Sequence, residues 1–136
     1  MTISGGCLCG AVRFEAAGEP LVSLKCHCRD CQYLSGGEPA DAVVMPSQAV
    51  TVVKGEARAY WTRADSGNRV YRSFCATCGT PLFAGNEAHP EAIAIKTGAL
   101  DEPARFPPKG HIWTASAQTW HHIDPALPSF DRNPPF

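Results

Sequence analysis

The chain has 136 residues and a formal net charge of -1, with 12 Lys and Arg against 13 Asp and Glu. This length fits one domain with a modest core, and the balanced charge offers no basic face, which excludes nucleic acid and anionic membranes as default partners. No stretch approaches the ~20 apolar residues of a membrane-spanning helix, and the first residues do not resemble a secretory leader. We therefore expect a single domain over residues 1–136 in the cytoplasm, where thiols stay reduced unless they are catalytic or bind metal.

Short segments rich in β-branched and aromatic residues lie between frequent turns along the chain. Glycine and proline contribute 12 residues each, which leaves little room for long helices. This pattern predicts an all-β domain of small, curled sheets. The expected strands cover residues 11–15, 21–24, 42–45, 49–53, 57–62, 69–74, 93–96 and 111–115.

Three further segments have a clear local signature. Arg29 to Ser35 is the most helical stretch, and two glycines end it. Residues 66–68, with the sequence Ser-Gly-Asn, predict the turn of a hairpin between two neighbouring strands. The proline-rich tail 127–136 can form neither a helix nor a central strand. We expect it to lie over the surface, with Phe130 and Phe136 as anchors.

The seven cysteines of the chain divide into a group of four and a group of three. An odd number of closely spaced thiols disfavours a disulfide framework, although disulfides and free buried or redox-active thiols stay alternatives to metal binding. The group of four consists of Cys7 with Cys9 and Cys75 with Cys78, enough to complete a tetrahedral zinc site, which would be structural. Gly79 supplies the positive φ that a turn of this type needs.

The group of three consists of Cys26, Cys28 and Cys31, one ligand short of a complete site. On an extended strand Cys26 and Cys28 project to the same side and His27 to the other, while a turn brings Cys31 back toward both sulfurs. Zinc with three protein ligands keeps one position open for water or substrate. We therefore expect two zinc ions per chain, the second at a reactive site. A site closed by His27 or His111 as fourth ligand stays the alternative.

Several side chains near the cysteines could modify the chemistry. Lys25 and Arg29 flank the group of three and could offset the negative charge of thiolates around zinc. His121 and His122 are expected to be exposed and non-catalytic, and Asp30 to hydrogen-bond within its turn. The tryptophans and tyrosines are expected in the core or a pocket wall, since no basic stripe accompanies them. These are Tyr33, Tyr60, Trp61, Tyr71, Trp113 and Trp120.

Motifs between residues 6 and 130 resemble the glutathione-dependent formaldehyde-activating enzyme family, which includes centromere protein V. All seven cysteines fall in register with the family pattern, and the ending from Trp120 to Phe130 is also similar. The matching motifs are Gly6-Cys7-Leu8-Cys9-Gly10, Cys26-His27-Cys28-Arg29-Asp30-Cys31 and Phe74-Cys75-Ala76-Thr77-Cys78-Gly79.

The resemblance implies an Mss4-like fold of small coiled antiparallel sheets with two zinc sites. It implies structural zinc on the group of four cysteines and catalytic zinc on the group of three. It also implies a carbon–sulfur lyase acting in the direction of bond formation, in which glutathione and formaldehyde give S-hydroxymethylglutathione.

The expected reaction follows from the open zinc position. A thiol that enters it loses its proton more easily and can attack formaldehyde or another small electrophile held beside it. We expect the substrate pocket around residues that closely follow or precede the ligands: Lys25, Arg29, Gln32, Ser35 and Gly36. A non-enzymatic zinc module that binds a thiol metabolite or a protein is the alternative. Methionine sulfoxide reduction would need a redox cysteine outside the metal sites.

Overall fold

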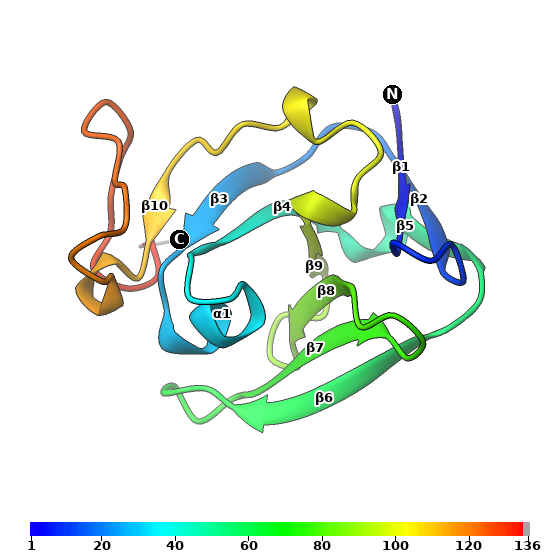
Figure 1. The fold of residues 1–136 in the computed structure, drawn as a ribbon, viewed down its shortest axis with the longest axis horizontal. Helices are drawn as coiled ribbons and strands as arrows, with labels where there is room; N and C mark the ends of the chain where they lie inside the picture. The colour runs from blue at the N-terminus through cyan, green and yellow to red at the C-terminus, as the bar shows by residue number, and fades with distance from the viewer. Residues whose placement is uncertain (135–136) are drawn as a thin grey trace.

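The computed structural model describes residues 1–134 and arranges them in two β-sheets (Figure 1). The smaller sheet has three strands in the order β1 (Thr2–Gly6), β2 (Arg13–Ala17) and β5 (Val50–Lys54). The larger has seven, in the order β10 (His111–Ile112), β3 (Val22–Cys26), β4 (Ala40–Pro46), β9 (Ala92–Lys96), β8 (Pro81–Asn86), β7 (Arg69–Cys75) and β6 (Ala57–Arg63). Neighbouring strands are antiparallel except β10 and β3, which are parallel. The predicted all-β class is confirmed.

Helical structure is confined to short segments. The helix α1 (Arg29–Leu34) follows β3 and lies within the curve of the larger sheet, between β3 and β7 (Figure 1). The 3-10 turns are η1 (Ser47–Ala49), η2 (Thr97–Ala99), η3 (Pro103–Arg105) and η4 (Thr114–Ser116). Among the described residues, none of the helices combines the length and apolar character that crossing a bilayer requires.

The core lies between the inner faces of the two sheets. Alternate residues of the strands point into it, so that Phe14 of β2 packs edge-on against Phe83 of β8 with ring centroids 5.0 Å apart. Ile3, Val43 and Ile95 are buried beside them. Burial of these apolar side chains holds the N-terminal hairpin against the strands that carry the cysteines.

Two strands of the structure were not expected from the sequence, and one expected strand is shorter. The strands β1 and β8 contain glycine, and β8 begins with proline, so neither has the dense β-branched pattern that predicts a strand. The expected strand 111–115 ends at Ile112, because Trp113 adopts a left-handed conformation with φ of 57° and η4 follows.

The predicted hairpin turn and the surface position of the tail are seen in the described residues. Residues 66–68 form the turn between β6 and β7, closed by a hydrogen bond from the Ala64 amide to the Asn68 carbonyl. The described part of the tail, residues 127–134, runs along the outer edge of the larger sheet, where the amide of His111 donates to the Pro128 carbonyl and that of Phe130 to the His111 carbonyl. Phe130 is partly buried there, and Phe136 lies outside the described residues.

Gly5 is placed where a side chain would collide with the core. A Cβ atom there would lie 2.3 Å from the carbonyl oxygen of Ala99 and 2.5 Å from the Phe14 ring, whereas a Cβ at Gly98 would meet open space. We predict that Gly5→Ala destabilises the domain by about 2 kcal/mol through overpacking, while Gly98→Ala leaves stability nearly unchanged. Denaturant unfolding of both variants checks this. Equal midpoints would mean that β1 is not packed tightly against η2.

Candidate metal centres

The four cysteines of the first group come together from the start and the middle of the polypeptide. Cys7 and Cys9 follow β1, Cys75 ends β7, and Cys78 lies in the next turn, with all four sulfurs within 4.8 Å of one another. The Sγ atoms of Cys7 and Cys9 are 3.6 Å apart, and those of Cys9 and Cys75 are 3.8 Å apart. A tetrahedral zinc site with bonds of about 2.3 Å has sulfur–sulfur edges of about 3.8 Å, so this arrangement fits zinc.

Backbone amides donate hydrogen bonds to sulfur atoms of this group. The Val12 amide donates to Cys7 Sγ at 3.2 Å, and the Thr77 amide donates to Cys75 Sγ at 3.4 Å. Hydrogen bonds from the side chain and backbone of Thr80 lower the pKa of Cys78 to about 5. Gly79 closes the turn with φ of 78°, as its sequence context predicted.

The second group lies at the junction of β3 and α1. Cys26 is the last residue of β3, Cys28 is the N-cap of α1, and Cys31 lies in the first turn of that helix. The Cys28 sulfur accepts a hydrogen bond from the Cys31 amide at 3.3 Å, and the three sulfurs lie within 4.8 Å of one another. The structure therefore brings together the three residues that the sequence grouped.

The charge of the second group has to be balanced from outside. Hydrogen bonds with Cys26 and Cys28, together with the positive charges of Lys96 and Arg72, lower the pKa of Cys31 to about 2. Hydrogen bonds with Cys28 and Cys31, together with burial, raise the pKa of Cys26, because a second thiolate beside the first is unfavourable. A divalent cation would remove this conflict, so the donor set fits a metal ion.

Lys96 and Arg72 were not identified from the sequence as neighbours of this site. The pairings Cys26↔Ala40 and Ala42↔Lys96 place Cys26 and Lys96 on the same face of the sheet. Arg72 of β7 also faces α1, with its Nη1 atom 3.8 Å from the Asp30 carboxylate. Asp30 thus makes an ion pair with a distant strand, whereas a hydrogen bond within its turn was expected. Only strand register could have revealed these two cations.

His27 points away from the cysteine sulfurs. Its side chain is fully buried, and its ring nitrogens contact Nδ1 of His121 at 3.0 Å and Nδ1 of His111 at 2.9 Å. Burial and the neighbouring His111 and His121 lower the pKa of His27 to about 4. Within residues 1–134, the second group contains no histidine. The expectation that His121 is exposed is wrong, since only 8% of it is accessible, whereas His122 is exposed.

The predicted substrate residues have different environments. Gln32 is buried, and its amide nitrogen donates to the carbonyls of His27 at 2.7 Å and Ser116 at 3.0 Å. Its amide oxygen accepts from Arg29, whose guanidinium also lies over the Tyr33 ring. The protein's own hydrogen bonds therefore occupy both polar atoms of the Gln32 side chain.

Two of the remaining predicted residues border neighbouring cavities, which share Glu38, Pro39 and Asp41 in their walls. Ser35 lines a cavity of about 360 Å³ together with Lys96 and Thr80. Lys25 pairs with Asp41 at 3.6 Å and lines a second cavity of about 370 Å³ with Trp120. Gly36 follows α1 and is exposed.

Most of the large aromatic side chains lie on the surface rather than in the core. Four of those expected in the interior or in a pocket wall are exposed, and the other two are partly buried. This expectation is therefore wrong for Tyr33, Tyr60 and Trp61. Trp120 is also exposed, but it lies in the wall of the cavity that Lys25 borders, as expected.

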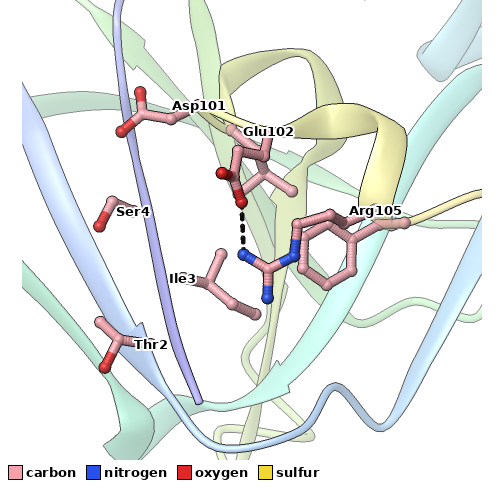
Figure 2. A pocket seen from close by; sticks show the side chains of 8 residues that line it. Thr2, Ile3, Ser4, Asp101, Glu102 and Arg105 are labelled. Carbon is pink, nitrogen blue, oxygen red and sulfur yellow. Dashed lines mark hydrogen bonds and ion pairs between the residues drawn. The ribbon is translucent and has the colours of Figure 1, made fainter.

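A third cavity lies away from the cysteines, between β1 and the segment after η2 (Figure 2). It has a volume of about 310 Å³ and, among the described residues, no cysteine lines it. Arg105 binds Glu102 at 2.6 Å within this cavity (Figure 2), and Asp101 is paired with Arg13. Because its charges are paired within the protein, we do not place the reaction there.

The fold and the two cysteine groups define a small all-β protein that could hold two metal ions. The family model of the glutathione-dependent formaldehyde-activating enzyme matches residues 2–116, so the chain belongs to this family. A Halomonas elongata protein, named provisionally as a glutathione-dependent formaldehyde-activating enzyme, is 28% identical over 130 residues, covering 91% of this chain and 82% of the relative. A crystal structure of a Rhodobacter sphaeroides protein has a TM-score of 0.57 and 24% identity, covering 72% of this chain and 87% of that one, which supports the fold.

The two groups should differ in what they contribute to folding. Cys75 is 1% exposed within the core, so Cys75→Ser should abolish cooperative folding, because metal binding at a closed site provides on the order of 10 kcal/mol. Cys28→Ser should keep the fold, since serine is also a good N-cap, and should lose one metal ion. Metal analysis and thermal unfolding followed by circular dichroism measure both effects. Equal loss of folding in both variants would show that the second site is structural too.

Proposed function

We propose that this protein is a zinc-dependent enzyme of the carbon–sulfur lyase type that adds a thiol, glutathione or a similar one, to formaldehyde or another small electrophile. The observation that carries this proposal is the group of three cysteines, whose sulfurs lie within 4.8 Å of one another without a fourth protein ligand among residues 1–134. In the reaction the thiol sulfur forms a bond to the carbonyl carbon, and the proton lost from sulfur ends on the carbonyl oxygen. Bound zinc would supply a lowered pKa for a coordinated thiol.

We propose that the zinc ion of the first group, at Cys7, Cys9, Cys75 and Cys78, stabilises the fold. Four thiolates complete its coordination and leave no position for substrate. Such an ion would join the loop after β1 to the end of β7, which are distant in sequence. The cytoplasm fits this assignment, because free thiols persist in a reducing compartment.

Lys96 is the side chain we propose to recognise the charged part of the thiol substrate. It is 9% exposed and lines the cavity that Ser35 also borders, and no ion pair within the described part of the chain involves it. Its charge helps to lower the pKa of Cys31, and Glu38 and Asp41 line the same cavity without forming an ion pair with Lys96. A buried ammonium group that no carboxylate pairs with can bind an anionic ligand. Arg29, Gln32, Ser35 and Gly36 stay predicted contacts, whereas we expect only a minor contribution from Lys25, because Asp41 already pairs with its ammonium group.

Other functions are less well supported. Methionine sulfoxide reduction needs a redox cysteine, and all seven cysteines belong to one of the two groups. A zinc module that only binds a thiol would have the same ligands, so the distinction is whether product forms. Incubation with glutathione and formaldehyde, followed by detection of S-hydroxymethylglutathione, decides between the two.

Coordination of the thiol can be tested apart from turnover. In protein loaded with Co²⁺, glutathione should change the visible sulfur-to-metal absorption bands because a fourth thiolate joins the three of the second group. S-methylglutathione has no free thiol and should leave the spectrum unchanged. The same spectrum with both compounds would mean that thiol does not reach the metal.

The role of Lys96 is tested against Lys25, which already has a partner in Asp41. We predict that Lys96→Gln weakens glutathione binding on the order of tenfold, because a charge-assisted hydrogen bond to a carboxylate is lost. Binding of the neutral thiol 2-mercaptoethanol should not change. Lys25→Gln serves as the matched control, with a much smaller effect on either thiol. If both variants discriminate equally between glutathione and 2-mercaptoethanol, Lys96 does not belong to the substrate site.

A further inference from the structure

A chain of three buried histidines lies directly behind the second cysteine group. His27 is 0% exposed, His111 1% and His121 8%. Nε2 of His27 lies 2.9 Å from Nδ1 of His111, and Nδ1 of His27 lies 3.0 Å from Nδ1 of His121. The chain ends on two backbone groups: the Asp124 amide at one end, 3.1 Å from Nε2 of His111, and the Gly37 carbonyl at the other, 2.8 Å from Nε2 of His121.

The backbone groups at the two ends determine where each proton lies. The Asp124 amide can only donate, so Nε2 of His111 accepts and a neutral His111 carries its proton on Nδ1. That Nδ1–H donates to Nε2 of His27, which leaves the proton of His27 on Nδ1. The Nδ1–H of His27 then donates to Nδ1 of His121, whose own proton is on Nε2.

The opposite end requires the same arrangement. The Gly37 carbonyl can only accept, so Nε2 of His121 must be the donor. The Gln118 amide lies 3.3 Å from Nδ1 of His121, which confirms this nitrogen as an acceptor. Protonating any one ring would add a second N–H and place two donors against each other, or a donor against a backbone amide. The geometry therefore fits three neutral rings with one direction of hydrogen bonding.

The chain of hydrogen-bonded histidines connects four segments of the polypeptide near the second cysteine group. His27 lies between the ligands Cys26 and Cys28, and Gly37 follows α1. His111 belongs to β10, and the remaining members belong to the loop 118–124.

We propose that the directional chain from Asp124 through His111, His27 and His121 to Gly37 is a positioning device that holds Cys26 and Cys28 in place for the metal. His27 is then a positioning residue and not a ligand. The inference rests on the proposed assignment of the three cysteines as a metal site, and it is independent of the thiol and of the electrophile. Because both ends of the chain are backbone groups, it holds geometry and does not carry protons to the substrate.

Nuclear magnetic resonance tests the arrangement in the zinc-loaded, unmodified protein. Long-range ¹H–¹⁵N correlation spectra near pH 7 distinguish the protonated nitrogen of each ring. We expect His27 and His111 with the proton on Nδ1 and His121 with the proton on Nε2. Any other tautomer, or an imidazolium, at one of the three positions overturns the proposal. This measurement needs neither thiol nor aldehyde, so it succeeds or fails independently of the proposed activity.

Two substitutions at His111 test whether hydrogen bonding, rather than packing, positions the ligands. The amide nitrogen of asparagine can occupy the place of Nδ1, so His111→Asn keeps a donor toward His27, whereas His111→Leu removes it. We expect Co²⁺ affinity at the second group to fall on the order of tenfold in His111→Leu and by less than about twofold in His111→Asn, as for other groups that orient metal ligands. His89→Asn, at an exposed histidine, controls for the loss of an imidazole.

Each outcome of this comparison is decisive. Retention of affinity in His111→Asn with loss in His111→Leu supports the proposal, and rescue by asparagine would not follow from a packing role. Equal losses in both variants, or no loss in either, contradict it. If His111→Leu does not fold, the tautomers in the unmodified protein still decide.

Discussion

Crowding of three thiols in one site is the constraint on which the rest of the second centre depends. Two unit charges 4 Å apart repel by about 4 kcal/mol at an effective dielectric constant of 20, and three thiolates make three such pairs. The sum is comparable with the whole stability of a small domain, ~5–15 kcal/mol. The arrangement with all sulfurs within 4.8 Å of one another is therefore stable only with shared protons or with a cation between them. The positive charges of Lys96 and Arg72 favour the Cys31 thiolate, and they reduce the repulsion between thiolates without removing it.

The cysteine groups could be predicted from the sequence because their geometry is local. A spacing of one or two residues brings thiols to one side of a strand end or turn, whatever the rest of the fold does. The two halves of the first group could be paired across the chain because two close pairs of thiols together complete a tetrahedral site. Lys96 and Arg72 could not be predicted in this way, because they reach the site only through the register of β4, β7 and β9.

Residue polarity alone gave the wrong location for several side chains. Tyr33, Tyr60 and Trp61 were expected in the core or in a pocket wall, and His121 on the surface. Instead the three aromatic side chains are exposed and His121 is buried. The core is filled by aliphatic residues and phenylalanines from the two sheets, which leaves little volume for further large rings. A polar ring can be buried when its hydrogen-bonding atoms are satisfied, and both nitrogens of His121 have partners. Those partners lie far away in sequence.

Strand alternation gives the Cys-His-Cys motif two functions at once. The geometry that points Cys26 and Cys28 toward the metal site sends the residue between them to the opposite side. On that side the parallel pairing of β10 with β3 places His111 on the same face as Lys25, and hence as His27. A histidine there finds partners that fix its ring, and its carbonyl accepts from Gln32 of the helix that carries Cys31. The orientation of the three ligands is thus coupled to β10 and to the loop 118–124 through one side chain that does not touch the metal.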